Sequence, residues 1–345
     1  SKPRTKPIYD NRMVALMSKI GVKIFRDPQS IYDPDQLFQA LKVYGEKPTF
    51  WRDGFIERAF SKALAVFGYR DTMPKLAPLK QVTQDLIKLD RSAGVYLMSK
   101  AEAFPVAERR AADILNGTKK PNPCIAFART QKGNKTRLVW GYPLDMTLLE
   151  SRFGVQLIEK FKTIRSPITY SLRRYELGAR LASTIRGRYS LSLDFSKFDS
   201  TLSSEVIMMA FKILKTWFQM DEEDERAWKI VTDYFVRTSI VMPDGHLYTG
   251  KNHGVPSGSL FTQLIDSISN FLISQACFLS CGIFVPVECH HVLGDDSIVS
   301  TNSDINLHDL RRAFKRYGLN LNMEKSKIST PEEGYEYLGT LWKDG

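Results

Sequence analysis

The sequence predicts an α+β fold in which helices back an antiparallel sheet. Between residues 189 and 342, the segments follow one another as strand, helix, hairpin, loop, helix, hairpin, helix and strand. Short strands joined by tight turns pair antiparallel, and the amphipathic helices between them supply a covering layer. The composition is that of a globular protein, with 43% hydrophobic and 25% charged residues in a chain of 345. This length allows one large domain or two to three subdomains.

Positive charge is concentrated in the first part of the chain. Residues 1–200 contain 36 Lys and Arg against 19 Asp and Glu, whereas residues 201–345 contain 13 against 19. A basic region beside an acidic one suggests a track for a polyanion that leads to a cation site, although lysines that only solubilise a surface are an alternative. No apolar run reaches the roughly 20 residues of a membrane span. The basic N-terminus also lacks the apolar core of a signal peptide, so we expect no membrane partner.

The first 125 residues combine helical patterns with connections rich in Pro and Gly. DQLFQALKVYG (35–45) and FIERAFSKALAVFG (55–68) have the apolar spacing of amphipathic helices. A tight-turn signal between apolar segments follows at Ser92, Ala93 and Gly94.

A cluster of cations comes next, in RTQKGNKTRLVWGYP (129–143). Around a Gly-Asn turn, the cluster contains Arg129, Lys132, Lys135 and Arg137. The residues after it are apolar and strand-like. Four cations beside a turn predict a hairpin that binds phosphate, although a solvated basic loop is an open alternative.

Two aspartates lie between a strand and a helix in RYSLSLDFSKFDSTL (188–202). Apolar and polar residues alternate up to Asp194, which predicts a strand that ends there. Asp199 follows in the turn before the amphipathic helix SSEVIMMAFKILKTWF (203–218), whose serines suit an N-cap. Further along, the patterns predict a helix over 222–238 and a hairpin over 239–250.

A flexible Gly/Ser loop and a long helix follow in residues 254–281. From about Leu260 onward, helical spacing gives one polar and one apolar face. The polar face contains Thr262, Asp266 and Asn270, and the apolar face contains Leu264, Ile268 and Leu272.

Two short apolar strands flank a Gly-Asp-Asp turn in HHVLGDDSIVS (290–300). Turn chemistry alone accounts for Gly and Asp at such a tip. A magnesium site is the other explanation, because the adjacent carboxylates of Asp295 and Asp296 repel each other unless a cation or a proton lies between them. The segments after this hairpin predict a helix over 307–319, a polar connection over 320–329 and a strand over 336–342.

The cysteines do not follow a secreted disulfide framework. A zinc site could in principle combine Cys277, Cys281 and Cys289 with His290 and His291. However, the first two cysteines lie in an apolar helical pattern and the third lies in the strand before the turn. We therefore expect these three, and Cys124, to be small apolar residues of the core.

In their order along the chain, these segments resemble the motifs of viral RNA-dependent RNA polymerases. The matching segments are the turn at 92–94, KGNKTR (132–137), LDFSKFD (193–199), PSGSLFT (256–262), LGDDS (293–297), NMEKSK (322–327) and YEYLG (335–339). The resemblance covers about residues 90–340 and is greatest to small segmented double-stranded RNA viruses, the partitivirus and picobirnavirus group. It implies a right-hand polymerase fold with fingers and a palm sheet.

The resemblance also implies nucleotidyl transfer from NTPs to an RNA 3′-hydroxyl with two Mg²⁺ ions, for which Mn²⁺ can substitute. Asp194 and Asp295 would be the principal metal ligands, with Asp296 as an auxiliary carboxylate. Lys325 would be the general acid that protonates pyrophosphate, and Lys327 is the open alternative.

The remaining motifs would bind the nucleotide and the template. The triphosphate would be held by Arg129, Lys132, Lys135 and Arg137, and the template would be guided by Ser92, Ala93 and Gly94. The ribose 2′-hydroxyl would be recognised by Asp199, Ser257 and Thr262, with Gly258 allowing close backbone approach.

One position departs from a widespread form of the family pattern. The residue four after Thr262 is often Asn, but here it is Asp266, and Asn270 comes one turn later. Either residue could therefore complete the sugar contact. A second acid near Asp199 would add repulsion unless it is protonated or paired.

We expect residues 1–188 to form the N-terminal region and fingers, 189–218 the first part of the palm, 219–250 an insertion between fingers and palm, and 251–345 the second part of the palm. No helical thumb follows YEYLG, so the thumb is expected to be missing or truncated. The expected partners are template and product RNA, NTPs and a viral capsid protein, in the host cytoplasm and within the virion.

Two other functions stay open from the sequence. A reverse transcriptase shares the palm, but Asp199 and the Ser257-Gly258 loop fit ribose selection, and the turn lacks the Tyr-x-Asp-Asp form. A non-catalytic RNA-binding protein accounts for the basic region but not for the positions of the aspartates. A P-loop ATPase is disfavoured because no G-x-x-x-x-G-K-[ST] segment is present.

Overall fold

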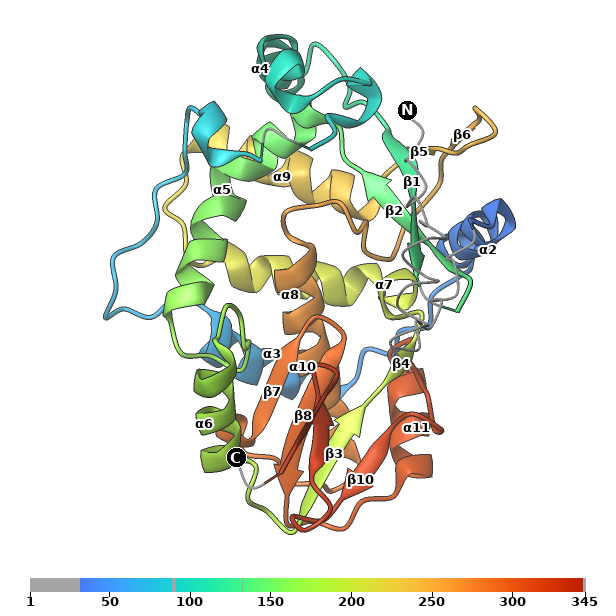
Figure 1. Ribbon diagram of the computed structural model, residues 1–345. Helices are drawn as coiled ribbons and strands as arrows, with labels where there is room; N and C mark the ends of the chain where they lie inside the picture. Colours follow the sequence, from blue (N-terminus) through green and yellow to red (C-terminus); the bar gives the residue numbers. More distant parts are fainter. Residues whose placement is uncertain (1–31, 89–90, 132, 344–345) are drawn as a thin grey trace, which may run out of the picture.

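The computed structural model describes residues 32–88, 91–131 and 133–343, which form two four-stranded sheets surrounded by helices (Figure 1). The predicted α+β class is confirmed. The helices are α2 (Pro34–Gly45), α3 (Gly54–Phe67), α4 (Lys100–Leu115), α5 (Leu144–Thr163), α6 (Arg174–Thr184), α7 (Phe198–Thr201), α8 (Ser204–Lys215), α9 (Glu222–Val236), α10 (Thr262–Ser280) and α11 (Leu307–Arg316).

One sheet is built from the strands beside the acidic motifs. Its order is β10 (Lys327–Ser329), β3 (Tyr189–Leu193), β8 (Asp296–Thr301) and β7 (His290–Leu293), with all neighbours antiparallel. Helix α10 packs on β7 and β8 and also contacts α3, α8 and α11. Because α10 is enclosed by these elements, its buried residues lie on all sides rather than on one face. This is the predicted antiparallel sheet backed by helices.

The register of this sheet brings two distant segments to one edge. Leu193, the last residue of β3, lies opposite Ser297, and Leu293 at the end of β7 lies opposite Asp296. The end of β3 and the tip of the β7–β8 hairpin are therefore neighbours. In Figure 1 both lie at the end of the sheet that faces the second sheet.

The second sheet has the order β2 (Lys135–Gly141), β1 (Cys124–Gln131), β5 (Ile240–Val241) and β6 (Leu247–Tyr248). Strands β1 and β2 form the predicted basic hairpin, and Gly133 and Asn134 in its turn have φ of 78° and 57°. Gly and Asn tolerate this left-handed region better than other residues. Strands β5 and β6 form the predicted hairpin at 239–250, and β5 pairs with β1.

The prediction of one strand over 336–342 was wrong. The segment is a hairpin of β11 (Tyr335–Tyr337) and β12 (Thr340–Trp342), and Leu338 and Gly339 form its turn with φ of 53° and 69°. Because Leu338 is apolar, the sequence pattern contains no clear turn signal at this position. A further short pair joins β4 (Phe195–Ser196) to β9 (Asn320–Leu321).

The two histidines considered for zinc have other contacts, Cys277 is buried, and Cys281 and Cys289 are half-buried. The His290 ring stacks on Phe271 and lies 2.8 Å from the Gln275 amide nitrogen, and the His291 Nε2 lies 2.7 Å from the Thr184 hydroxyl. Within the described ranges, no three His, Cys, Asp or Glu side chains form a group that could hold a metal ion by itself. None of the helices described is long and apolar enough to cross a membrane.

Candidate active site

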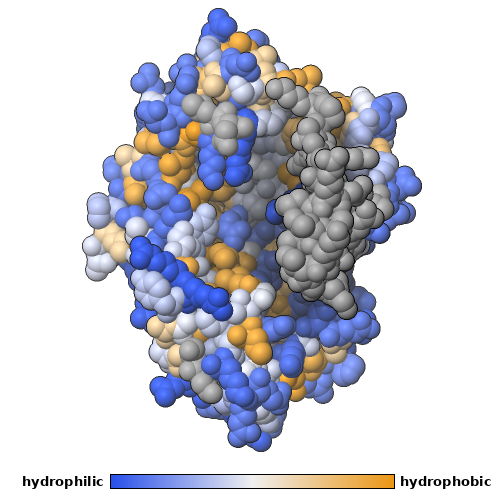
Figure 2. Space-filling view, viewed as in Figure 1, coloured by the Kyte–Doolittle hydropathy of each residue, from blue (hydrophilic) through white to orange (hydrophobic). Residues whose placement is uncertain are grey.

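A cleft of about 1030 Å³ runs between the hairpin of β1 and β2 and the edge of the sheet that contains β3 and β8. The face of the molecule in Figure 2 is hollowed near its middle. Residues predicted from four separate segments line this cleft, namely Arg129, Arg137, Asp199, Ser257, Thr262, Asp266 and Asp295. The fold therefore brings the basic, ribose-recognition and acidic motifs to one site.

Of the three predicted metal ligands, Asp295 lines the cleft, and backbone contacts hold the sheet edge beside it. The Asp194 backbone N–H donates to the Ser326 hydroxyl at 3.0 Å, and its carbonyl accepts from the Asn322 N–H at 2.8 Å. In the hairpin turn, Gly294 has a φ of 62° and donates its N–H to the Ser267 hydroxyl at 2.8 Å. The aspartate backbones are thus fixed even though the turn is at the surface.

Burial and neighbouring negative charges raise the pKa of both turn carboxyls. Partial burial, followed by the charges of Asp295 and Asp194, raises the pKa of Asp296 to about 6. Partial burial and then Asp194 also raise the pKa of Asp295, which the Arg137 guanidinium partly offsets. Because burial and a neighbouring negative charge disfavour ionisation of both turn carboxyls, the turn favours a cation or a proton beside them. Magnesium suits such a site because it takes a few carboxylates and leaves positions for phosphate oxygens.

The basic wall of the cleft comes from one strand pair. Arg129 on β1 lies directly opposite Arg137 on β2, and both side chains are exposed. Within the described part of the chain, neither guanidinium forms an ion pair. Like charges placed opposite each other on a sheet cost stability, so this pair favours a polyanion such as a triphosphate.

Asp199 and Asp266 are in contact at the floor of the cleft. Burial raises the pKa of both carboxyls, and the Asp199 charge raises that of Asp266 further. The pKa of Asp266 is the more strongly raised, and its side chain is almost fully buried. The second acid near Asp199 is therefore Asp266, and burial together with the Asp199 charge disfavours its ionised form.

Asn270 has a different location from Asp266. Its side chain is fully buried, and its Nδ2 donates to the carbonyls of Gly294 at 3.1 Å and Asp296 at 3.4 Å. Of the two candidates for the sugar contact, Asp266 lines the cleft, whereas Asn270 is bonded to the backbone of the acidic turn.

We expect Asp266→Asn to stabilise the fold at neutral and alkaline pH. A carboxyl whose pKa is raised by folding disfavours the folded state increasingly as pH rises above its unfolded value near 4, and an amide has no such dependence. Urea unfolding with EDTA between pH 4 and pH 8 measures this. The increase in the free energy of unfolding over wild type should grow with pH. The same change at the exposed Asp304 should give no such trend. A difference in the free energy of unfolding that does not change with pH would contradict the raised pKa of Asp266.

The loop before α10 is fixed against β2. The Trp140 N–H donates to the Ser257 hydroxyl at 3.2 Å, and the Thr262 hydroxyl donates to the Pro256 carbonyl at 3.0 Å. A Cβ atom on Gly258 would lie only 1.7 Å from the Trp140 carbonyl oxygen. Close backbone packing, rather than a left-handed φ, is therefore what requires glycine here.

Other predicted residues lie away from the cleft or outside the described residues. Lys132 lies outside the described residues, and Lys135 is exposed on β2 but is not part of the cleft lining. Gly94 packs on the segment after β2, where an added Cβ would meet the Tyr142 carbonyl oxygen at 2.6 Å, and neighbouring Ala93 is buried. Lys325 is exposed in the turn that contacts the Asp194 backbone.

Sequence patterns missed three residues beside the site. Lys197 lines the cleft with a φ of 55°, and its position between the two aspartates of LDFSKFD was an available signal. Glu150 on α5 is fully buried and accepts from the Ser259 hydroxyl at 2.6 Å and the Leu260 N–H at 2.9 Å. Burial raises the pKa of Glu150 to about 8. Tyr44 on α2 also lines the cleft, and nothing in its helical pattern marks it.

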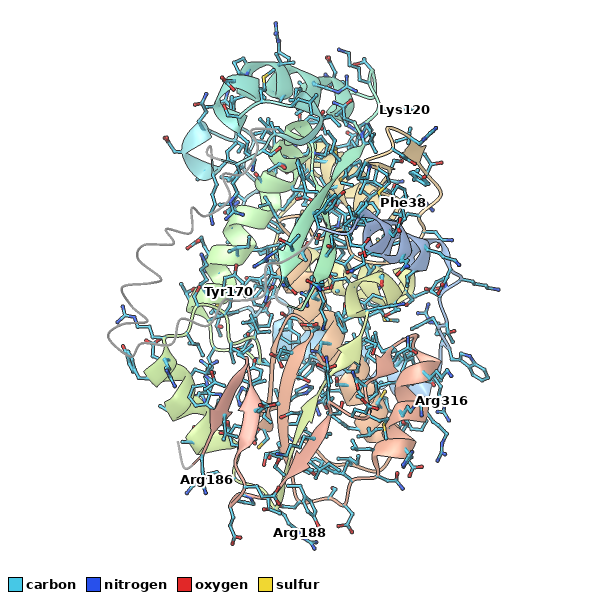
Figure 3. All side chains as sticks on the ribbon, turned by 45° about the vertical axis from the view of Figure 1, so that its right-hand side comes forward. Phe38, Lys120, Tyr170, Arg186, Arg188 and Arg316 are labelled. Atoms are coloured by element: carbon cyan, nitrogen blue, oxygen red, sulfur yellow. The ribbon has the colours of Figure 1, made fainter. Side chains whose placement is uncertain are left out.

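The basic residues do not form one continuous track. In Figure 3, Arg186 and Arg188 lie at the end of the molecule opposite Lys120. Arg188 is paired there with Asp304 at 3.6 Å, and its guanidinium lies over the Tyr189 ring. The excess positive charge of residues 1–200 is thus divided, and only part of it faces the cleft.

Comparison with known proteins identifies the family. A family model described as viral RNA-dependent RNA polymerase matches residues 86–345. The chain belongs to the viral RNA-dependent RNA polymerase family. The chain is 31% identical over 226 residues to the RNA-directed RNA polymerase of Cryptosporidium parvum virus 1, a match that covers 60% of this chain and 42% of that relative.

Two further polymerases support the predicted resemblance. The RNA-directed RNA polymerase of White clover cryptic virus 1 is 25% identical over 249 residues, covering 62% of this chain and 40% of that relative. The crystal structure of a human picobirnavirus RNA-dependent RNA polymerase superposes with a TM-score of 0.72 at 17% identity, covering 95% of this chain and 66% of that one. The chain thus matches less than half the length of the two curated relatives. The predicted polymerase fold is confirmed.

Proposed function

We propose that this polymerase-family chain synthesises RNA on an RNA template by transferring nucleotides from NTPs to an RNA 3′-hydroxyl. The observation that carries the proposal is the cleft in which Asp295 faces the guanidinium of Arg137. Phosphoryl transfer needs carboxylates for metal ions and cations for the triphosphate, held on opposite sides of the reacting phosphate. The family match supports this reading.

Asp194, Asp295 and Asp296 would hold two Mg²⁺ ions, for which Mn²⁺ can substitute. The raised pKa values of Asp295 and Asp296 support a metal site. A cation would stabilise the ionised forms of carboxyls whose ionisation is otherwise disfavoured. When bound, the metal would supply charge stabilisation to the attacking and leaving oxygens. The protein's own part is to hold the three carboxylates on a fixed sheet edge.

Arg129 and Arg137 would bind the triphosphate and neutralise the charge that develops on it. Lys325 would give a proton to the leaving pyrophosphate. Its turn is bonded to the Asp194 backbone through Asn322 and Ser326, which supports a position near the reacting phosphate. Lys327 on β10, opposite Ser192, is the competing candidate.

Ribose selection would depend on the acid pair. The raised pKa of both carboxyls supports a pair that shares one proton. Such a pair would offer both a donor and an acceptor to a 2′-hydroxyl, which itself donates and accepts. Ser257 and Thr262 would border the sugar from the loop before α10. A deoxyribose would leave these polar groups without a hydrogen-bond partner. An enzyme site of this kind discriminates strongly between NTPs and dNTPs.

The same proposal divides the chain into an N-terminal region and fingers over 1–188, a palm over 189–218 and 251–345, and an insertion between fingers and palm over 219–250. The pairing of β5 with β1 supports assigning the insertion to the fingers side. Template would be guided by Ser92, Ala93 and Gly94. Synthesis would take place in the host cytoplasm within a virion, with the capsid protein as a partner.

Incorporation of labelled NTPs on a short primed RNA template, with Mg²⁺ or Mn²⁺, tests the function. Extension that needs the template and prefers NTPs to dNTPs is expected. A preference for dNTPs would favour a reverse transcriptase. Bound RNA without any extension would favour a non-catalytic RNA-binding protein.

Exchanging one guanidinium tests the triphosphate site. Arg137→Met should raise the KM for NTP by roughly 10-fold or more, because a hydrogen bond to a charged group contributes about 1.5–3 kcal/mol. Lys135→Met makes the same change in charge on the same strand but away from the cleft, so its KM should change less than about threefold. Steady-state extension at varied NTP measures both, and equal effects would contradict the assignment to Arg137.

A further inference from the structure

We propose that Tyr44 is a positioning residue that sets ribose recognition by holding the loop of residues 253–258 against Asp199. This inference rests on the proposed function and deepens it. Tyr44 lies in the last turn of α2, its side chain is 7% exposed, and it borders the nucleotide cleft on one side and a second cavity on the other. Nothing in the chemistry of the motifs requires a tyrosine from this helix.

A chain of two hydrogen bonds links Tyr44 to Asp199. The Tyr44 hydroxyl donates to the Val255 carbonyl at 2.8 Å, and the Val255 N–H donates to the Asp199 carbonyl at 2.7 Å. Burial and the nearby Asp199 charge raise the pKa of Tyr44 well above its usual value, so the hydroxyl remains a donor. One side chain of α2 thus restrains the backbone of a cleft aspartate that is 155 positions away in the sequence.

The ring of Tyr44 also shapes the loop. Gly254 has a φ of 81°, and a Cβ atom there would lie 2.6 Å from the Tyr44 ring and 3.1 Å from the Asp199 carbonyl oxygen. The loop therefore passes between Tyr44 and Asp199 without room for a side chain. A second contact joins the same elements, since the His253 Nε2 lies 3.1 Å from the Val43 carbonyl oxygen.

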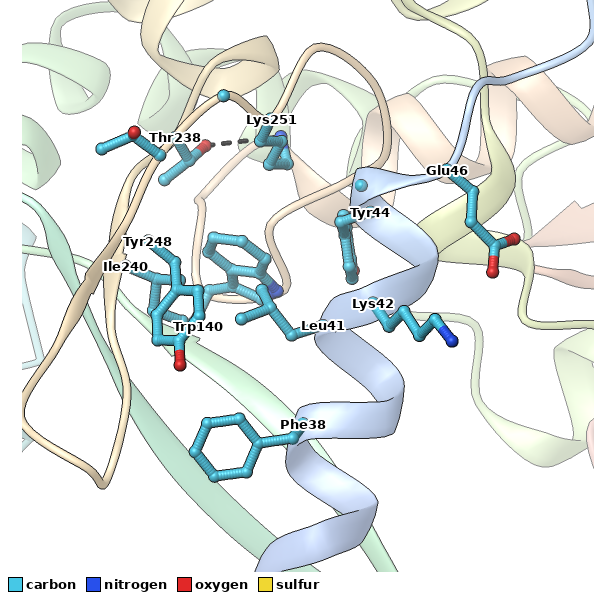
Figure 4. A pocket seen from close by; sticks show the side chains of 13 residues that line it. Phe38, Leu41, Lys42, Tyr44, Glu46, Trp140, Thr238, Ile240, Tyr248 and Lys251 are labelled. Carbon is cyan, nitrogen blue, oxygen red and sulfur yellow. Dashed lines mark hydrogen bonds between the residues drawn. The ribbon is translucent and has the colours of Figure 1, made fainter.

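Trp140 contacts both Tyr44 and the other end of the loop, at Ser257. Its ring meets Tyr44 edge to face at 4.9 Å, and its backbone N–H donates to the Ser257 hydroxyl. The Lys251 Nζ lies 5.9 Å from the centre of the Tyr44 ring and 5.7 Å from that of Trp140 (Figure 4). It donates to the carbonyls of Phe235 and Val236. Tyr44, Trp140 and Lys251 also line a cavity of about 580 Å³.

The first turn of α2 is tied to the basic hairpin. The Gln36 Oε1 accepts from the Thr136 N–H at 2.8 Å, and its Nε2 donates to the Asn134 carbonyl at 2.9 Å. Helix α2 therefore connects the strand of Arg137 to the loop of Ser257. A rigid helix bonded at both ends fixes the spacing between the triphosphate side and the ribose side of the cleft.

Tyr44→Phe tests the inference because it removes only the hydroxyl and keeps the ring contacts. Loss of one buried hydrogen bond corresponds to a change of up to about tenfold. We expect the NTP-over-dNTP ratio of kcat/KM to fall roughly three- to tenfold and the KM for NTP to rise, with kcat within about twofold and RNA binding unchanged. Tyr234→Phe is the matched control, because its buried hydroxyl donates to the Asn122 carbonyl at 2.7 Å away from the cleft.

The outcomes separate this inference from the function on which it rests. A lowered discrimination in Tyr44→Phe but not in Tyr234→Phe, at similar losses of thermal stability, supports the positioning role. Equal discrimination in wild type and Tyr44→Phe overturns the positioning role and leaves the proposed function standing. Absence of synthesis by wild type overturns the proposed function and this inference together.

Discussion

Replacing Asp295 by alanine should lower the rate of nucleotide addition by roughly a thousandfold or more, because metal-assisted charge stabilisation supplies several kcal/mol and each 1.36 kcal/mol is tenfold in rate. RNA binding should remain close to wild type, since it depends mainly on cation contacts to the phosphate backbone. Single-turnover primer extension and a fluorescence binding titration measure the two effects separately.

Asp304→Ala is the matched control for this change. Asp304 is an exposed aspartate after the far end of β8, paired only loosely with Arg188 at 3.6 Å. Its replacement should leave the rate of nucleotide addition and the affinity for RNA within about twofold of wild type, because exposed ion pairs contribute little. A variant at Asp295 that loses RNA binding while keeping its rate would contradict the assignment of the acidic turn.

Gly258→Ala should lower nucleotide addition by roughly a hundredfold and destabilise the fold by about 1–3 kcal/mol. The added Cβ would lie 1.7 Å from the Trp140 carbonyl oxygen and 3.3 Å from the Tyr142 N–H nitrogen, and neither backbone atom can move independently of β2. The loop would instead move away from the strand, and Ser257 with it. Steady-state kinetics and urea unfolding of the variant measure the two losses.

Gly154→Ala provides the comparison for the glycine prediction. Gly154 lies in α5, where an added Cβ would meet Leu260 at 3.4 Å, an ordinary contact distance. Alanine is also the better helix former, so this variant should be as stable as wild type and as active. Wild-type activity in Gly258→Ala would show that the close approach to Trp140 does not constrain the nucleotide site.

Local elements of the site were predictable because their signals are short. A Gly-Asn turn between alternating residues predicts the β1–β2 hairpin, and Gly294 with two aspartates predicts the β7–β8 turn. Such turns need φ > 0 at particular positions, which few residues tolerate. The motif order then implied that Asp194 joins this turn, and the pairing of β3 with β8 places its strand there.

Contacts between distant segments could not be predicted in the same way. Helical spacing puts Asp266 and Asn270 on one face of α10, but only the packing of α10 against the β7–β8 turn decides that Asn270 is bonded to Gly294. In the sequence, Tyr44 cannot be distinguished from the other apolar residues of an amphipathic helix. Its hydrogen bond to Val255 depends on a tertiary contact across 211 positions, for which a single sequence contains no signal.

The most direct test of the central claim is single-nucleotide addition to a primed RNA whose first template base is varied through all four identities. We predict that each template base directs incorporation of its complementary NTP, that the reaction needs Mg²⁺ or Mn²⁺, and that Asp295→Ala abolishes it. Addition that is independent of the template base, or equal in wild type and Asp295→Ala, would contradict RNA synthesis at this cleft.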